Sequence, residues 1–358
     1  MTETPSEAAA SLVRRYLLPR SVLSGLACVV AAFAIGAILI ALIGRDPVHA
    51  YWSLFEASLG STNGLAETAI RTVPLALCGI GIALAFRAGV FNVGAEGQLF
   101  IGGIAAAWMG LQLSGQPQWL VLPAMGLAAA LAGALWSGIA GVLKLKLRAD
   151  ELITTIMLNY VAIYFVGYLL HGPLQEPGSP LARTARLATE ARLPTILEGT
   201  RLHAGLLIVI VIAILAQVFL WRSVAGFKLR AVGHNQRAAE NTGMNVKAAL
   251  WTGFLICGAL AGLAGFSEVA GVQRRMIENL SPGFGYTAII VALLGQTNPL
   301  GVLAAAVLFA ALQIGSTTME SAAGVPSALT TVIQALVVLL LLAQNALPRL
   351  LAKRRKEA

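Results

Sequence analysis

Two polar runs interrupt an otherwise apolar sequence, and they hold most of the side chains that could act on a solute. The first run is FNVGAEGQ, residues 91–98, and the second is DELITTIMLNY, residues 150–160. A polar or charged group at membrane depth is costly, so it usually faces other protein or a water-filled path. The chemistry on offer is hydrogen bonding to a polar solute. The candidate pathway residues are Phe91, Asn92, Glu96, Gln98, Thr155 and Asn159.

Each run has two interpretations. The glycines of 91–98 favour a broken helix beside a transport path, because irregular backbone is tolerated where it lines a cavity. The same residues also fit a tight cytoplasmic turn in which Glu96 helps to start the next helix. Thr155 and Asn159 are four residues apart and share a helix face. Asn159 either binds a neighbouring helix or lines the path.

Glu268 is a lesser candidate near the outer end of a later apolar segment. It either belongs to the external mouth of a path or pairs with Arg274 or Arg275.

The most polar long segment covers residues 222–247 and has long apolar segments on both sides. Asn235 is placed to cap a helix and Gly243 to end it, which predicts a short helix outside the bilayer. The segment is either a solvated basic loop or a docking element. Its charged residues are Arg222, Lys228, Arg230, Arg237, Glu240 and Lys247.

Composition places these segments in a membrane. Hydrophobic residues make up 58% and charged residues 11% of the chain, where a soluble domain has about 25% charged residues. The net charge of +9 lies largely in short loops between apolar spans, which is typical of membrane orientation rather than nucleic-acid binding. The three cysteines lie inside apolar spans and show no metal or disulfide spacing. The fold class is therefore an all-α polytopic membrane protein.

About ten transmembrane helices are expected, each needing about 20 apolar residues. A cytoplasmic tail, 1–20, precedes a transmembrane domain, 21–347, and a basic cytoplasmic tail, 348–358, follows it. Residues 44–66 are expected to form a polar loop. The predicted spans are 21–43, 68–86, 96–114, 119–143, 152–170, 204–221, 248–270, 284–296, 299–319 and 327–347.

Basic residues orient these spans. With the N-terminus in the cytoplasm, the inside segments hold most of the 25 basic residues, including those of 222–247 and of the C-terminal tail. Spans two to five and seven to ten are offset by five crossings. An odd offset brings the second set in from the opposite face, as an inverted repeat requires.

Enzyme signatures are missing from the sequence. It has no GxxxxGK[ST] phosphate loop, no HExxH pair and no GxSxG elbow. Polar residues within the spans are mostly neutral, whereas ion-driven carriers more often show buried acid or histidine relays. This pattern favours an uncharged polar solute and an energy source outside this chain.

Three runs in order, FNVGAEGQ, DELITTIMLNY and GHNQRAAENTG (233–243), resemble the permease subunits of bacterial ABC importers. The group includes branched-chain amino acid, ribose-type sugar and nucleoside permeases, and the first two runs are most similar to the nucleoside/simple-sugar branch. The resemblance covers about residues 65–345.

The resemblance implies a type II importer-like fold of two inverted halves in the bacterial inner membrane, with both termini cytoplasmic. It implies nucleosides as substrates, with simple sugars such as ribose or galactose as the alternative. It also implies an ABC ATPase, a second permease that is identical or not, and a substrate-binding lipoprotein or periplasmic protein. ATP and Mg²⁺ would bind the ATPase, and this chain would bind no cofactor or metal. The implied ATPase-coupling residues are His234, Asn235, Arg237, Ala238, Ala239, Glu240 and Gly243.

A transporter that works without an ATPase remains the less favoured alternative, and a scaffold without transport is a third interpretation. The polar residues within the spans argue against the scaffold.

Overall fold

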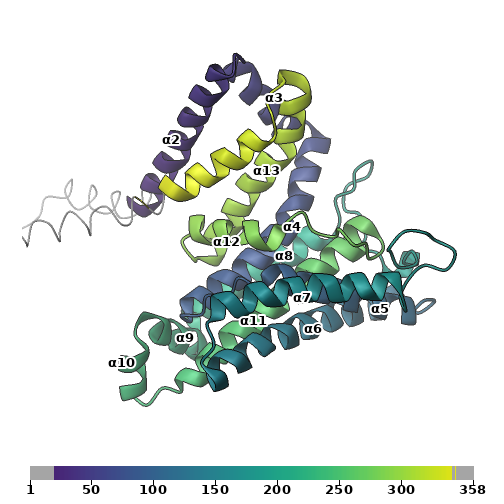
Figure 1. The fold of residues 1–358 in the computed structure, drawn as a ribbon, viewed down its shortest axis with the longest axis vertical. Helices are drawn as coiled ribbons and strands as arrows, with labels where there is room; N and C mark the ends of the chain where they lie inside the picture. Colours follow the sequence, from purple (N-terminus) through teal and green to yellow (C-terminus); the bar gives the residue numbers. More distant parts are fainter. Residues whose placement is uncertain (1–19, 341–342, 344–358) are drawn as a thin grey trace, which may run out of the picture. The chain divides into compact units, whose positions relative to one another are not determined.

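The computed structural model describes residues 20–340 and residue 343, and every regular element in this part of the chain is a helix (Figure 1). The prediction of an all-α polytopic membrane protein is confirmed. The first 19 residues and the basic tail 348–358 lie outside the described residues, as does most of the end of the last predicted span.

Each of the first nine predicted spans overlaps a helix, and the described part of the tenth is helical over Ala328–Leu340. Six helices are long and apolar enough to cross a membrane; ten crossings and an inverted repeat stay predictions. The elements are α2 (Arg20–Leu42), α3 (Pro47–Leu59), α4 (Thr62–Arg87), α5 (Ala95–Gln112), α6 (Gln118–Leu147), α7 (Glu151–His171), a short 3-10 helix η1 (Thr189–Ala191), α8 (Gly205–Arg222), α9 (Val224–His234), α10 (Gln236–Asn241), α11 (Val246–Ser267), a π-helical turn η2 (Glu268–Gln273), α12 (Phe284–Leu294), α13 (Pro299–Ala323) and the helix Ala328–Leu340.

The prediction of a polar loop over 44–66 is wrong, because α3 and the start of α4 occupy it. Asp46 accepts the N–H of Val48 at 2.9 Å, and Pro47 suits a first helical position. Ala50 and Leu54 are buried one turn apart, so α3 has an apolar face despite its polar residues. α4 begins early because Ser61 caps it through the N–H of Gly64 at 3.0 Å.

The chain divides into two units, residues 58–311 and residues 1–57 with 312–358. In the described part of the smaller unit, the hydroxyl of Tyr51 donates to the carbonyl of Phe33 at 2.7 Å. Gly36 lies against Ile333 and Gly315 against Leu54. These contacts join α2 and α3 to the C-terminal helices of the same unit.

In the larger unit, α11 is the central helix and packs against α4, α5 and α6. Small residues permit this close approach. A Cβ on Gly262 would overlap the carbonyl oxygen of Ala129 on α6. Helices in membranes associate through such small-residue contacts, where the backbones meet.

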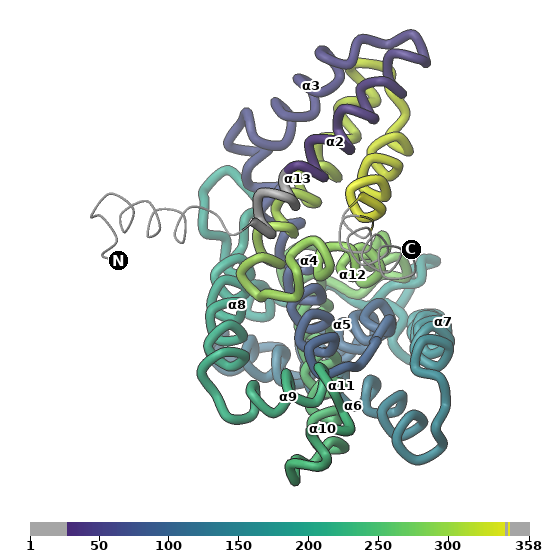
Figure 2. Tube along the Cα trace, turned by 90° about the vertical axis from the view of Figure 1, so that its left-hand side faces the viewer, coloured from purple at the N-terminus to yellow at the C-terminus, as the bar shows by residue number. Residues whose placement is uncertain are grey.

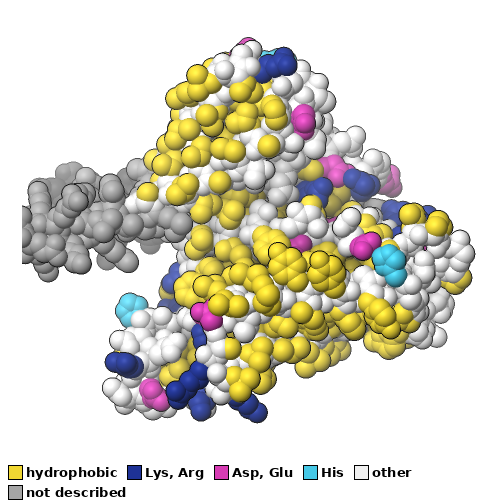
Figure 3. All heavy atoms as spheres, viewed as in Figure 1, with side chains coloured by type: hydrophobic (Ala, Val, Ile, Leu, Met, Phe, Trp, Pro, Cys, Tyr) yellow, Lys and Arg dark blue, Asp and Glu magenta, His cyan; other side chains and the backbone are white. Residues whose placement is uncertain are grey.

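The outer surfaces of α6 and α7 in this unit are apolar (Figure 3). On α6, Leu127, Leu131 and Leu135 recur every four residues and are 54–72% exposed. Apolar surface of this extent marks contact with lipid or partner protein. The buried polar groups described below therefore lie behind helices whose outer faces suit a bilayer.

Replacing Gly262 with alanine is expected to lower the stability of the larger unit by about 1–3 kcal/mol, the usual cost of overpacking. The backbone of Ala129 must move to admit the methyl group. Gly126→Ala on α6 is the matched control, because its Cβ would find no atom closer than 3.8 Å. Thermal unfolding of the two variants in detergent compares them, and equal melting temperatures would contradict the packing argument.

Candidate functional site

The turn between α4 and α5 lies inside the larger unit. α4 ends at Arg87, Gly89 has a positive φ of 78°, and α5 begins at Ala95. Asn92 is fully buried and its Oδ1 accepts the N–H of Gly94 at 2.8 Å. We call residues 88–94 the buried turn.

Asn92 also connects the buried turn to two helices. Its Oδ1 accepts Nε2 of Gln98 at 3.2 Å, and its Nδ2 donates to Oγ of Ser137 on α6 at 3.2 Å. Ser137 in turn donates to the carbonyl of Phe254 on α11 at 2.7 Å. Buried amides of this kind are well paired, as buried polar groups must be.

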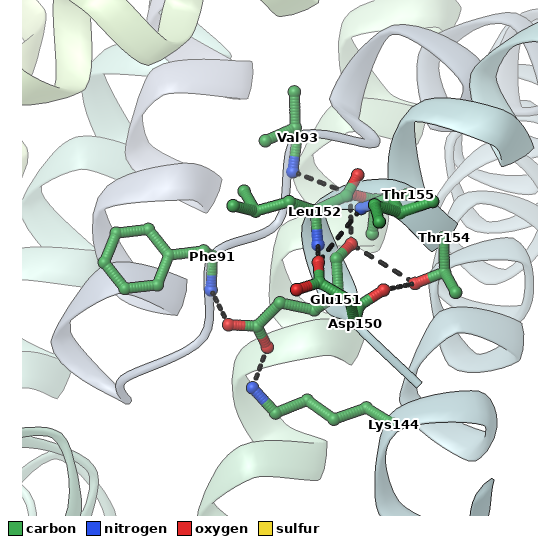
Figure 4. Close-up of polar contacts among 9 residues, drawn as sticks. Phe91, Val93, Lys144, Asp150, Glu151, Leu152, Thr154 and Thr155 are labelled. Atoms are coloured by element: carbon green, nitrogen blue, oxygen red, sulfur yellow. Dashed lines mark hydrogen bonds and ion pairs between the residues drawn. The ribbon is translucent and has the colours of Figure 1, made fainter. Parts of the chain in front are cut away.

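One face of α7 holds the other side of the buried turn, through residues spaced four apart (Figure 4). Glu151 accepts the N–H of Phe91 at 3.1 Å, and Thr155 accepts the N–H of Val93 at 3.3 Å. Glu151 also forms an ion pair with Lys144 at the end of α6. Asp150 starts this face by capping α7, because its side chain accepts the N–H groups of Leu152 and Ile153.

Asn159 completes this face. Its Oδ1 accepts the N–H of Gly97 at 2.9 Å, and its Nδ2 donates to the carbonyl of Val93 at 3.0 Å. Nδ2 also donates to the hydroxyl of Tyr286 on α12 at 3.3 Å. Every polar atom of this amide is therefore engaged with neighbouring protein.

Glu96 lies where two helices begin. It belongs to the first turn of α5, and its Oε2 accepts the N–H of Gly285, in the first turn of α12, at 2.6 Å. A carboxylate between two helix N-termini complements both helix dipoles.

The structure thus brings Asn92, Glu96, Gln98, Thr155 and Asn159 into one buried cluster. Phe91 differs, since it is 53% exposed and its ring lies 5.2 Å from that of Phe86. α12 itself has 11 residues, which at 1.5 Å per residue gives about half the hydrocarbon thickness.

Replacing Asn159 with alanine is expected to destabilise the protein by about 1–3 kcal/mol per buried group left unpaired. The N–H of Gly97 and the carbonyl of Val93 would both lose their partner. Thr154→Ala on the same helix is the control, because its hydroxyl binds only backbone of its own first turn. A melting temperature of Asn159→Ala equal to that of the control would show that Asn159 does not brace the turn.

The polar segment 222–247 forms two short helices, which lie at one end of the larger unit (Figure 2). The predicted helix after Asn235 is confirmed as α10, with Asn235 Oδ1 accepting the N–H of Ala238 at 3.1 Å and Gly243 following at a φ of 79°. α9, capped by Ser223, is an additional helix. Basic side chains gather at this end (Figure 3). Of the coupling candidates, Ala239 is buried, whereas the exposed ones are His234, Asn235, Arg237, Ala238, Glu240 and Gly243.

α9 is packed directly against the buried turn. A Cβ on Gly233 would overlap the carbonyl oxygen of Arg87 and lie 3.0 Å from the N of Gly89. The guanidinium of Arg87 donates to the carbonyls of Gln296 (3.1 Å) and Thr297 (3.3 Å). This contact links α9, the end of α4 and the turn before α13.

Trp221, at the end of α8, extends this junction. Its ring lies 4.4 Å from the guanidinium of Arg230 and 5.8 Å from that of Arg87. Cation–π contacts of this kind help to fix Arg230 on α9 against the end of α8.

A cavity of about 460 Å³ lies in the larger unit, between the first half of α4, η2 and the loop before α12. Its volume is that of a small-molecule site. The guanidinium of Arg201 donates two hydrogen bonds to the carboxylate of Glu67, from Nε at 2.9 Å and from Nη2 at 2.8 Å. The polar lining residues are Glu67, Arg71, Arg201, Glu268, Gln273, Asn279 and Ser281.

Sequence reasoning found only Glu268 among these residues, and its suggested pairing is wrong. Among the described residues Glu268 forms no ion pair with Arg274 or Arg275, and Arg275 instead contacts Glu176 at 3.3 Å. One signal in the sequence could have indicated the cavity. Glu67 and Arg71 are four residues apart, so they share a face of α4.

His203 packs against η2. Its ring packs against Gly271, and its Nδ1 accepts the N–H of Gly205 at 3.2 Å. Burial lowers the pKa of His203 to about 4, so the imidazole is neutral near pH 7. It therefore adds no charge next to the cavity.

Long apolar helices around a buried polar turn, with exposed basic helices at one end, define a multi-pass membrane transport subunit. The chain belongs to the family described as branched-chain amino acid transport system / permease component, whose model matches residues 64–342. It is a permease subunit of an ABC transporter, as the resemblance in its sequence implied.

The relatives that match most of the chain include three named ABC transporter permeases. A glucose ABC transporter permease protein of Haloferax volcanii is 39% identical, covering 90% of this chain and 87% of its own length. A guanosine ABC transporter permease protein of Bacillus subtilis is 36% identical, over 93% of this chain and 96% of its own. A nucleoside ABC transporter permease protein of Lactococcus lactis is 32% identical, over 89% and 90%.

Proposed function

We propose that this chain is the membrane permease of an ATP-driven importer of nucleosides. The observation that carries the proposal is the similarity, along most of both chains, to guanosine and nucleoside permeases. The relative with 39% identity is named for glucose and favours a simple sugar as the second candidate. Both solutes are uncharged and polar, which agrees with the mostly neutral polar residues of the spans.

The proposal includes a set of partners. An ABC ATPase binds and hydrolyses ATP with Mg²⁺, and this chain binds no cofactor of its own. A second permease, identical or not, completes the membrane part, and a substrate-binding lipoprotein or periplasmic protein delivers the solute. The bacterial inner membrane surrounds the helices.

The orientation follows from charge. We place both termini, α9 and α10 in the cytoplasm, because basic residues concentrate in cytoplasmic segments. The exposed residues of α10 and its flanks (His234, Asn235, Arg237, Ala238, Glu240, Gly243) then contact the ATPase, and buried Ala239 holds α10 to the permease. The cavity lined by Glu268 lies toward the outer face.

The same contacts suggest how ATP drives the change of access. Closure of the ATPases displaces α10, and α9 transmits the movement to the buried turn through Gly233. The buried turn then moves α5, and Glu96 carries the movement to the start of α12. Asn92, Gln98, Thr155 and Asn159 keep the turn and its helices moving as one body. Nucleotide supplies the difference in binding energy that such a switch needs.

Uptake by a host lacking this gene and rescued by it tests the substrate. Labelled guanosine, uridine and adenosine are compared with glucose, ribose and galactose. We expect rescued nucleoside uptake that excess sugar does not compete. Rescue of sugar uptake alone would contradict the nucleoside proposal and assign the permease to sugars.

A further inference from the structure

Glu268 presents an unusual carboxylate in the cavity. Its side chain is 4% exposed, and no described residue donates a hydrogen bond to it. A buried carboxylate normally has its oxygens satisfied, so one that faces a cavity without a donor calls for an explanation. Arg71 is near enough to interact with it electrostatically, although the guanidinium lies over the ring of Phe284, at 5.3 Å.

The charges around the cavity balance. Glu67 and Arg201 satisfy each other at the rim, where Arg201 is 65% exposed. Arg71 offsets Glu268, so the cavity carries two acids and two guanidinium groups. Such a cavity has no net attraction for an ion and suits a neutral solute with hydroxyl donors.

The carboxyl group of Glu268 is suited to a solute that carries hydroxyl donors. A carboxyl group offers two oxygens that can accept hydrogen bonds. Carboxylates use this property to bind the hydroxyl groups of ribose in other proteins. Gln273, Asn279 and Ser281 add donors and acceptors at the same cavity.

We propose that this cavity is a solute-binding site in which Glu268 accepts hydrogen bonds from the ribose hydroxyls of a nucleoside. The inference rests on the proposed function, because it places the ribose of the proposed nucleoside substrate in this cavity. Ser281 extends the site inward, because it lines the cavity and its Oγ accepts the N–H of Phe284, at the start of α12, at 2.9 Å. A bound ribose would therefore lie beside the helix start that Glu96 also contacts.

The test uses the complete transporter, with its ATPase, second permease and binding protein, in proteoliposomes. Uptake of labelled guanosine is competed by guanosine, 2′-deoxyguanosine and 2′,3′-dideoxyguanosine. The wild type is expected to prefer the ribonucleoside, and Glu268→Gln to reduce that preference by about tenfold or more, as losing a charged hydrogen bond implies. The binding protein is the same in both assays, so the change belongs to the permease. Glu56→Gln, an exposed acid of α3, should keep the wild-type preference.

An unchanged preference in a Glu268→Gln transporter that still imports guanosine would overturn the inference and leave the proposed function standing. A wild-type transporter that imports no nucleoside would instead contradict the proposed function. Asn279→Cys gives a second readout if Glu268→Gln does not assemble, because Asn279 is exposed at the cavity. We expect guanosine to slow its labelling by a membrane-impermeant thiol reagent more than dideoxyguanosine does. Equal labelling rates without ligand, with guanosine and with dideoxyguanosine would contradict the proposal that the cavity binds the nucleoside.

Discussion

Gly233→Val is expected to reduce ATP-driven uptake by about tenfold or more. The added side chain would overlap the carbonyl oxygen of Arg87, and backbone atoms cannot move aside as the end of a flexible side chain can. Overpacking costs about 1–3 kcal/mol, and each 1.4 kcal/mol of coupling is a factor of about ten. α9 would therefore be displaced from the buried turn, and movement of α10 would no longer reach α5.

The measurement separates coupling from assembly. The Gly233→Val complex is purified, and its ATPase content, its ATP hydrolysis and its uptake in proteoliposomes are recorded. We expect the ATPase to remain bound and hydrolysis to continue, while uptake falls. Ala225→Val is the control, because Ala225 is exposed on the same helix. Uptake by Gly233→Val at the level of this control would show that the contact does not transmit movement.

Exchanging the charges of Arg237 and Glu240 is expected to release the ATPase and stop uptake. The two side chains are exposed and lie three residues apart on α10, and they are its charged residues. Like charges placed opposite each other at an interface cost several kcal/mol, so recovery of the ATPase with the tagged permease should fall by about tenfold or more. The net charge of the chain does not change in the double variant.

Arg186 and Glu190 provide the matched control. They are also exposed and oppositely charged, four residues apart in the loop between α7 and α8. Exchanging their charges should leave recovery of the ATPase unchanged. If the exchange at Arg237 and Glu240 left both recovery and uptake intact, these residues would have no part in docking.

Local signals in the sequence predicted much of the fold. Asp150 and Asn235 cap helices through their own side chains, so the starts of α7 and α10 could be inferred from a few residues. The long apolar segments of the sequence predicted the long helices. α3 was missed because polar residues interrupt its short apolar face, and α9 because a basic segment between spans suggests a loop.

Contacts between distant segments could not be predicted. Asn159 was expected either to bind a helix or to line a path, and only the fold shows its amide bound to Val93 and Gly97. The pair of Glu67 and Arg201 joins residues 134 positions apart, and Glu96 meets Gly285 from 189 positions away. Neither residue type nor spacing specifies such partners, because tertiary packing decides them.

The most direct test of an ATP-driven nucleoside permease is guanosine uptake by the reconstituted transporter, with an intact and with a hydrolysis-deficient ATPase partner. We predict accumulation against a gradient with the intact ATPase and ATP, and none with the deficient partner. Accumulation that is equal in both preparations would contradict the account, since it would make this chain a transporter that works without an ATPase.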